Sequence, residues 1–540
     1  MVRKILLVTL LFSAYSFAQQ DANSTVEQKQ ELSWEQLRDQ YEFPSWYTEA
    51  RFGIWSVWGP QSQEYGGGWY ARNMYKQHDA PKWADKVYSH HLNNYGHPSE
   101  HGYKDLIHQW KAENLDTNAL MKYFKSLGAR YFMVLANHHE HYDLWNSSHH
   151  EWNSVNVGPK RDIVGEWKIA ADKYDMPFAV TVHDDRFLRW WKDAFGADNT
   201  GPKKGVPYDG RLTKADGKGK WWQGLDPAKL YGLPPEERTP AYIEEVGKHF
   251  EQRHKELVTK YDVDMLWYDG HGFPYGKYGK EVSRTLFANS LKKHGKIQAV
   301  MAGKFYNQES SIVEDIERGG ANEIKLRPWQ SITNLSSWYY TGAPFGHNAR
   351  SMIEMMSDVF SKNGNLVLNV ELKLDGTIPA HHKPILDEIG HWVNVNGKAI
   401  YASNPWKIYG DNLGSSELSA KELLAQAEEA DLGHYRKLAA EKEQYNERKK
   451  DALPYGSNEV RFTTKGDKLY IFVLNPKAGT IELPSLGNNS PQEPSQIKEI
   501  TMIGSEQPIE FRQNGDALLL TVPTDRPTGY TTVFEVSGAL

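Results

Sequence analysis

Two groups of acidic residues in this sequence lie next to short apolar runs and could supply the carboxyl groups of a hydrolytic site. Asp269 ends one such run, and Glu314, Asp315 and Glu317 follow another. Hydrolysis of a glycoside with retention of configuration needs two carboxyl groups about 5–5.5 Å apart, one as nucleophile and one as acid/base. Asp269 is the candidate nucleophile. The second group is equally compatible with a surface loop in which Arg318 forms a salt bridge.

A histidine-rich segment, ANHHEHYDLWNSSHH at 136–150, contains His138, His139 and His141. Neighbouring residues of a strand point to opposite faces, so His138 and His139 are not expected to share one metal ion. Imidazoles at the end of a strand can instead donate hydrogen bonds to substrate hydroxyls, and structural histidines are an equal alternative. The sequence therefore predicts no metal ion and no cofactor, and a metal-dependent hydrolase is the less favoured hypothesis.

Short apolar runs alternate with helical patterns between about residues 45 and 405. This alternation is typical of a parallel sheet covered on both faces, and over this length it predicts an α/β fold closed into a (β/α)8-like barrel. Active sites of such barrels lie at the carboxyl ends of the strands, where three runs end on Asn137, His183 and Asp269. The expected strands are 131–137, 178–183, 264–269, 297–303 and 365–370, with helices at 116–128 and 241–261 among them.

The N-terminus has the pattern of a cleavable secretory signal. Arg3 and Lys4 precede an apolar run that ends in small residues at Ser16 and Ala18. Cleavage is expected after Ala18, and the protein is expected to be secreted or periplasmic. No later stretch reaches the about 18 apolar residues of a membrane span, so no membrane insertion of the mature form is expected.

The composition of the chain changes twice after residue 406. Residues 407–455 are rich in Ala, Glu and Lys and include Ser419-x-x-Glu422, a capping-box pattern, which predicts a charged helical insertion or linker. Short alternating strands after this segment predict a C-terminal antiparallel β-sandwich. The expected organisation is a signal peptide at 1–18, a barrel catalytic domain at 19–406, the insertion at 407–455 and the sandwich at 456–540.

Composition also narrows the class of partner. The net charge is −6 and no Lys/Arg-rich stripe occurs, so nucleic acid is not an expected partner. The 19 Trp and 30 Tyr residues supply flat amphipathic rings that suit the faces of sugars. The expected substrate is an oligo- or polysaccharide, and an oligomer is compatible with the sequence.

Five blocks, in order along the chain, carry a family resemblance: ARFGIWSVWGPQS…WYARNMY (50–75), ANHHEHYDLWNS (136–147), NVGPKRDIVGEW (156–167), DMLWYDG (264–270) and MSDVFSKNGNLVLNVELKLDGTIP…GHWVNVNGKAIYASNPW (356–406). They look like glycoside hydrolase family 29, the α-L-fucosidases. The resemblance implies a retaining exo-glycosidase with a (β/α) barrel, no metal ion, and the nucleophile at the strand end Trp267-Tyr268-Asp269.

The resemblance also implies roles for individual residues. His138 and His139 match paired histidines that contact the sugar, and Trp267 matches an aromatic wall residue. Glu317, upstream of the RPWQ block, resembles the acid/base of the family, with Glu314 as the fallback. The predicted substrate-binding residues are His138, His139, Trp267, Trp58, Trp69, His183 and Lys304.

Several positions depart from the family pattern. Val57 stands where the family usually has a sugar-binding histidine, and Gly68 stands where it has a glutamate. Each lost neutral contact is worth about 0.5–1.5 kcal/mol. His183 and Lys304 stand where the family has other polar residues. The expected substrate is therefore a terminal α-L-fucosyl residue or a closely related sugar, including a sulfated or methylated one. The alternative is a catalytically decayed carbohydrate-binding protein of the same fold.

Overall fold

The computed structural model describes residues 31–305, 310–342, 346–413, 444–446 and 455–540. The predicted signal peptide and most of the predicted helical insertion lie outside the described residues. No helix in the described part of the chain is long and apolar enough to cross a membrane.

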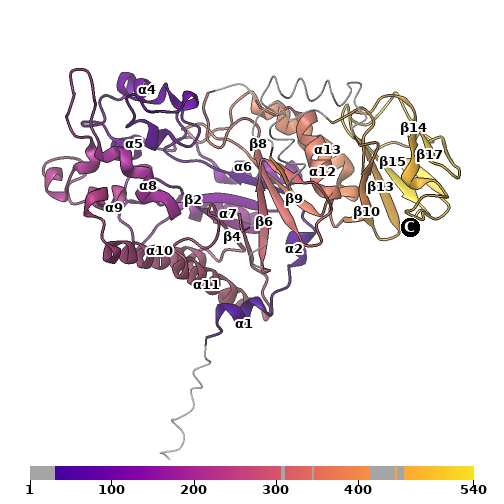
Figure 1. The fold of residues 1–540 in the computed structure, drawn as a ribbon, viewed down its shortest axis with the longest axis horizontal. Helices are drawn as coiled ribbons and strands as arrows, with labels where there is room; N and C mark the ends of the chain where they lie inside the picture. The colour runs from indigo at the N-terminus through magenta and orange to yellow at the C-terminus, as the bar shows by residue number, and fades with distance from the viewer. Residues whose placement is uncertain (1–30, 306–309, 343–345, 414–443, 447–454) are drawn as a thin grey trace, which may run out of the picture.

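Eight parallel strands form a closed barrel at the centre of the molecule (Figure 1), which confirms the predicted (β/α)8-like fold. The first and last strands pair with each other, with Phe52 opposite Leu366, and this pairing closes the sheet. The barrel strands, in order around the sheet, are β1 (Phe52–Ser56), β2 (Phe132–Asn137), β3 (Phe178–Val182), β4 (Met265–Tyr268), β5 (Val300–Gly303), β6 (Ile312–Glu317), β8 (Trp329–Asn334) and β9 (Gly364–Asn369).

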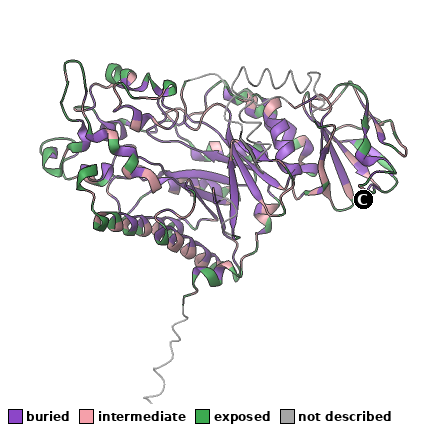
Figure 2. Ribbon diagram, viewed as in Figure 1, coloured by how far each residue is buried: buried purple, intermediate pink, exposed green. Residues whose placement is uncertain are grey.

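The barrel strands are buried on both faces (Figure 2), and most of them are nearly continuous apolar runs, whereas β6 and β8 also contain polar residues. Every residue of β2, β3 and β4 is buried. At the carboxyl ends of these strands the chain leaves the buried layer, so the side chains that follow can be polar. This is the physical reason why the run that ends at Tyr268 is followed by an aspartate.

Amphipathic helices cover the outside of the barrel. Helix α10 (Pro240–Lys260) starts at Thr239, whose side chain accepts a hydrogen bond from the Tyr242 amide, and has proline at its first position. Helix α11 (Lys277–His294) ends at Gly295 in the left-handed conformation. The remaining helices are α1 (Trp34–Arg38), α2 (Ser45–Thr48), α3 (Tyr70–Asn73), α4 (Val87–Asn94), α5 (Tyr103–Gln109), α6 (Thr117–Ser126), α7 (Ile163–Lys173), α8 (Phe187–Trp190), α9 (Pro227–Tyr231), α12 (Ala349–Ser361) and α13 (His382–Ile400).

The C-terminal region folds as two antiparallel sheets around one apolar core, as predicted. The five-stranded sheet has the order β10 (Asn404–Asp411), β12 (Val460–Lys465), β13 (Lys468–Val473), β18 (Thr532–Ser537) and β15 (Glu499–Met502). The three-stranded sheet has the order β14 (Gly479–Leu483), β17 (Leu518–Val522) and β16 (Phe511–Gln513). Because β10 pairs with β12, the sequence boundary placed after residue 406 falls inside a strand of this region.

The barrel and the C-terminal sheets are joined by α12 and α13, which lie between them in Figure 1. Arg461 of β12 donates a 2.6 Å hydrogen bond to Asp358 of α12, and both side chains are buried. Trp392 of α13 donates to the carbonyl of Thr531.

One described piece of the predicted insertion is a strand rather than a helix. Strand β11 (Gln444–Asn446) pairs antiparallel with β7 (Gly319–Ala321). Since β7 begins two residues after Glu317, this piece of the insertion pairs with the strand that directly follows the candidate acid/base.

Candidate active site

Asp269 lies immediately after β4, at the carboxyl end of the barrel. Its amide donates a 3.2 Å hydrogen bond to the carbonyl of Val182, which extends the pairing of β3 and β4 by one residue. The backbone of Asp269 is therefore held by the barrel itself, while its side chain, 14% exposed, faces a cavity. A carboxylate fixed in this way suits a nucleophile, because its position does not depend on a loop.

Lys304 joins the two candidate catalytic carboxylates. Its ammonium lies 2.7 Å from Oδ1 of Asp269 and 2.7 Å from Oε2 of Glu317. Because both oxygens contact the same nitrogen, the distance between Oδ1 of Asp269 and Oε2 of Glu317 cannot exceed the sum of the two contact distances. That limit agrees with the separation of about 5–5.5 Å between the carboxyl groups of retaining glycosidases.

Two histidines flank the other oxygen of the nucleophile candidate. Nε2 of His139 and Nδ1 of His183 each lie 3.3 Å from Oδ2 of Asp269. Burial lowers the pKa of His139 to about 3 and that of His183 to about 4, so both rings are neutral at physiological pH. Nδ1 of His139 lies against the carbonyl oxygen of His183, and this contact fixes the orientation of its ring.

The environment of Asp269 keeps its carboxylate ionised. Burial alone would raise its pKa, but the ammonium of Lys304 and the contacts with His139 and His183 hold the pKa well below the ordinary value of 3.8. The same attraction raises the pKa of Lys304, because Asp269 and Glu317 outweigh the effect of burial. An ionised carboxylate is the form that attacks an anomeric carbon.

The alternation of side chains along β6 separates the two acid/base candidates. Glu317 faces the cavity, where its Oε1 accepts a 3.2 Å hydrogen bond from Nε1 of Trp338. Glu314, three residues earlier, points to the other face of the strand and binds the ammonium of Lys325 at 2.7 Å. Among the described residues, the wall of the cavity includes Glu317 and not Glu314.

His138 and His139 do not diverge as the strand alternation led us to expect. Strand β2 ends at Asn137, so both histidines follow it in a turn, and their ring centroids lie 4.4 Å apart. Nδ1 of His138 lies 3.0 Å from both Gln61 and Glu140. These two partners set the orientation of the His138 ring.

Aromatic rings form much of the cavity wall. Trp267 packs against Trp55 with ring centroids 5.3 Å apart, and Trp338 lies 5.5 Å from Trp55 on another side. Trp69 also lines the cavity. The enclosed volume is about 140 Å³, well below the roughly 300–1,000 Å³ of sites for drug-sized ligands. The cavity is therefore sized for a small ligand rather than for a length of polymer.

The structure does not bring Trp58 to this cavity. Trp58 is buried, donates to the carbonyl of Lys373 and packs edge-on against Trp110. Val57 and Gly68, the two departures from the family pattern, do line the cavity. The cavity wall is therefore apolar at Val57 and has no side chain at Gly68.

A second cavity opens beside the first and shares Trp69 and Arg186 with it. Its volume is about 600 Å³. Arg186 donates to the backbone carbonyl of Asp269 at 3.3 Å, which ties the shared wall to the nucleophile candidate. The residues that line this outer cavity are Trp69, Arg72, Asp185, Arg186, Arg189, Trp190 and His271.

Sequence reasoning missed several residues of the site. Trp55, Arg186 and Trp338 line the cavity, and Gln61 and Glu140 orient His138. Trp55 is the last residue of the block FGIW, near the end of β1, and Arg186 follows His183 by three residues. A search of all strand ends could therefore have found these two. The sequence around Trp338 and Gln61 carries no such signal.

Two groups of three histidines come close enough to hold a metal ion. One consists of His138, His139 and His183, whose nitrogens lie within 4.8 Å of one another. In this group both nitrogens of His139 are already engaged, Nδ1 by the carbonyl oxygen of His183 and Nε2 by Asp269, so this ring has no nitrogen left for an ion. The other group lies outside the cavity.

A closed (β/α)8 barrel with two carboxylates at the carboxyl ends of β4 and β6, inside an aromatic cavity, is the architecture of a glycoside hydrolase. The sequence model of the family described as alpha-L-fucosidase matches residues 17–398. The chain belongs to the α-L-fucosidase family and is a glycoside hydrolase.

Curated relatives and solved structures agree with this assignment. The plasma alpha-L-fucosidase of Rattus norvegicus is 26% identical over 403 residues, which cover 71% of this chain and 75% of the relative. The alpha-L-fucosidase of Dictyostelium discoideum is 25% identical over 388 residues, 70% and 75% of the two chains. A solved alpha-L-fucosidase matches the fold with a TM-score of 0.65 at 22% identity, covering 94% of this chain and 99% of the other. The Thermotoga maritima alpha-fucosidase in complex with fucose gives 0.63 at 23% identity, with coverage of 93% and 99%.

Proposed function

We propose that this protein is an exported retaining exo-glycosidase that removes terminal α-L-fucosyl or closely related sugar residues. The observation that carries the proposal is the bridge from Asp269 through Lys304 to Glu317, which limits the distance between the two carboxylates to one compatible with the retaining mechanism. The small volume of the cavity supports action on a single terminal sugar. The N-terminal signal pattern supports export.

The reaction proceeds in two displacements. The Asp269 carboxylate attacks the anomeric carbon, the glycosidic bond breaks, and Glu317, in its protonated form, donates its proton to the leaving oxygen. Glu317, now a carboxylate, takes a proton from water, whose oxygen attacks the same carbon and releases Asp269. Each displacement inverts the configuration, so the product retains it. The paired indoles of Trp55 and Trp267 offer an apolar surface to the ring of the sugar.

The outer cavity supports a leaving group that carries negative charge. Arg72, Arg186 and Arg189 line it, and Asp185 is the acidic residue among its lining residues. Burial raises the pKa of Asp185 to about 7, so this carboxyl offsets the arginines only partly near neutral pH. Guanidinium groups bind sulfate and carboxylate oxygens through paired N–H donors. A sulfated or uronic-acid-containing glycan is therefore the substrate class that this surface fits.

The deciding experiment is hydrolysis of an aryl α-L-fucoside by the full chain, with NMR observation of the anomer formed first. We expect release of the phenol, the α-anomer as first product, and loss of turnover in an Asp269→Asn variant with an unchanged circular dichroism spectrum. A β-anomer as first product would contradict the double displacement. Turnover in Asp269→Asn comparable to that of the wild type would reject the nucleophile.

The absence of polar side chains at two positions of the cavity wall favours a second candidate function, a carbohydrate-binding protein without turnover. Val57 and Gly68 replace polar residues of the family pattern and line the cavity. This candidate predicts that sugars bind without product formation across fucosides and their sulfated forms. The Lys304 bridge argues against it, because binding alone does not require two carboxylates at catalytic spacing.

A further inference from the structure

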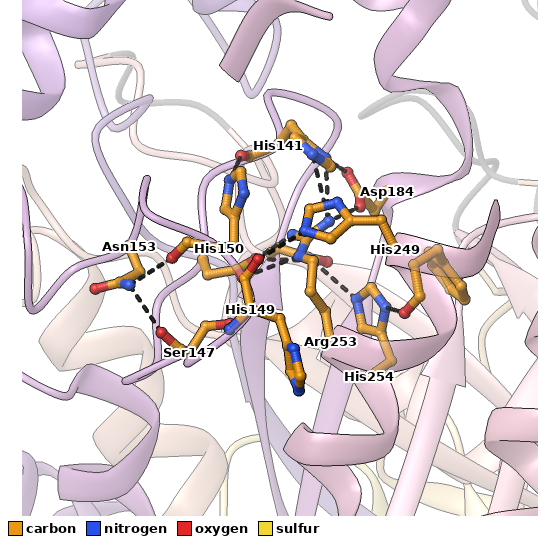
Figure 3. Close-up of polar contacts among 12 residues, drawn as sticks. His141, Ser147, His149, His150, Asn153, Asp184, His249, Arg253 and His254 are labelled. Carbon is orange, nitrogen blue, oxygen red and sulfur yellow. Dashed lines mark hydrogen bonds and ion pairs between the residues drawn. The ribbon is translucent and has the colours of Figure 1, made fainter. Parts of the chain in front are cut away.

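The second half of the histidine-rich segment lies outside the sugar-binding cavity. His141 and His150 come from this segment, and His249 comes from α10. One nitrogen of each ring lies within 4.8 Å of the corresponding nitrogens of the other two. Figure 3 shows the three rings facing a common centre beside Arg253. The cavity wall contains none of these three histidines.

Hydrogen bonds fix which nitrogen of each ring carries the proton. Nε2 of His150 lies 2.8 Å from the carbonyl oxygen of His141, and Nε2 of His249 lies 2.8 Å from that of His149. Nδ1 of His141 lies 2.7 Å from a carboxylate oxygen of Asp184. Carbonyl and carboxylate oxygens accept, so these nitrogens donate, and the remaining nitrogen of each neutral ring keeps its lone pair. Metal-binding histidines in proteins show the same outer arrangement.

Two further features of this cluster lack an explanation within the protein. Nδ1 of His150 is buried and, among the described residues, has no hydrogen-bond partner, although His150 is only 3% exposed. Buried polar atoms are rarely left in this state. His141 has a φ of 59°, in the left-handed region that residues other than glycine seldom adopt. The unpartnered buried nitrogen of His150 is the feature expected where a ligand fills a preformed site.

We propose that His141, His150 and His249 bind one divalent transition-metal ion of the zinc type. Three neutral imidazoles are the ligands that such ions prefer, and their nitrogens coordinate at about 2.0–2.1 Å. Coordination at this distance draws the three nitrogens closer than the 4.8 Å limit, which small rotations of the side chains provide. His249 is only half-buried, so solvent and the ion reach the cluster from its side.

The neighbouring guanidinium group does not prevent cation binding, because its charge is already offset. Nη1 of Arg253 lies 3.2 Å from Nδ1 of His141 and 3.5 Å from Nε2, the nitrogen left for the ion, and Arg253 is fully buried. It donates to Asp184 at 2.6 Å and pairs with Asp143 through Nε at 3.1 Å and through Nη2. Two carboxylates thus surround one guanidinium group.

The ion would link the segment after β2 to α10, next to the two histidines that flank Asp269. His141 follows His139 by two residues, and Asp184 follows His183 by one. His139 and His183 are the two rings that flank Asp269. The metal is therefore a structural element that stabilises the back of the site, and it takes no part in breaking the glycosidic bond.

The test uses the full chain without a polyhistidine tag, freed of metal by chelation and then equilibrated with Zn²⁺ alone. We expect one zinc per chain by elemental analysis, a higher Tm with Zn²⁺, and the visible absorption of tetrahedral cobalt when Co²⁺ replaces it. His249→Gln keeps a donor for the carbonyl of His149 but loses the imidazole. It should bind zinc at least about 100-fold more weakly, and His150→Gln should do the same.

Two control variants locate the ion. His391→Gln removes an exposed imidazole from α13, and zinc binding should be unchanged. His138→Gln removes a ring of the cavity cluster, and binding should also be retained. The proposal is overturned if the wild-type chain binds no zinc, or if folded His249→Gln and His150→Gln bind it normally. It is also overturned if His138→Gln abolishes binding, since the ion would then lie in the sugar cavity.

Discussion

The ammonium of Lys304 lies 2.7 Å from the carboxylate of Asp269, although the two residues are 35 positions apart in the sequence. Strands β4 and β5 are neighbours in the barrel, so each residue that follows them reaches the same edge. This contact with the ammonium of Lys304 keeps the buried carboxyl of Asp269 ionised. The second contact of the ammonium, with Glu317, fixes the spacing of the two carboxylates.

Removal of this ammonium should move the acid limb of the pH profile upward. Burial raises the pKa of Asp269, and Lys304 is the largest of the influences that hold it well below 3.8. In Lys304→Met the pKa of Asp269 rises, so more of the carboxyl is protonated at low pH. We expect kcat/KM of the variant to begin to fall at a higher pH than that of the wild type, with a tenfold loss for each unit by which the pH lies below the new pKa.

A matched control for this variant exists on the other face of β6. Lys325 also binds a glutamate at 2.7 Å, but that partner is Glu314, which points away from the cavity. Lys325→Met should leave the acid limb in place. Equal shifts in both variants would show that loss of any nearby positive charge explains the effect.

The identity of the acid/base is tested by comparing leaving groups. Glu317→Gln should lose at least about 100-fold in kcat/KM with a poor leaving group that needs protonation. With a 2,4-dinitrophenyl leaving group, which departs without a proton, the loss should be much smaller. Glu314→Gln should act on both substrates as the wild type does. An equal loss of Glu317→Gln activity on both substrates would contradict the role of acid.

The outer cavity should discriminate between charged and neutral leaving groups through its arginines. In Arg189→Met we expect KM to rise about twofold to fivefold for a sulfated leaving group and to stay constant for its neutral form. The difference should shrink at high salt, because added ions screen partly exposed charges. Equal KM changes for both substrates would show that Arg189 acts through packing.

Titration of Asp185 should make this discrimination depend on pH. Burial, more than any other influence, raises the pKa of Asp185 to about 7. As the pH falls through 7 the carboxyl becomes neutral, and the cavity gains positive charge. The ratio of KM values for sulfated and neutral substrates should therefore decrease from pH 8 to pH 6, and Asp185→Asn should remove this dependence. A constant ratio in the wild-type enzyme would refute it.

Restoration of the family residue at Gly68 should destabilise the protein. Gly68 has a φ of 104°, and a Cβ atom there would meet the ring of Tyr339 at 2.9 Å. We expect Gly68→Glu to lower the free energy of unfolding by about 1–3 kcal/mol, measured by urea denaturation. Gly205 has a φ of 78° and open space around it, so Gly205→Glu reports the backbone cost alone. Equal costs in the two variants would rule out the clash with Tyr339.

The sequence predicted five of the eight barrel strands, β2, β3, β4, β5 and β9, and the end of the barrel at which the site lies. Apolar runs buried on both faces mark parallel strands, and the polar residue after each run must face the open end of the barrel. That reasoning placed Asp269 and His183 correctly at strand ends. It works because a strand and the residue that follows it are neighbours in the chain.

Only the tertiary structure decided which side chains meet. The bridge at Lys304 joins residues 35 and 13 positions away, and the charged wall of the outer cavity joins Arg72 to Arg189. The positions of His138 and His139 depended on the residue at which β2 ends. Trp58 lies in a matching block, yet packs outside the cavity. Hydrophobic patterning is a property of neighbours in sequence, whereas these contacts arise only when the first and last strands pair and the barrel closes.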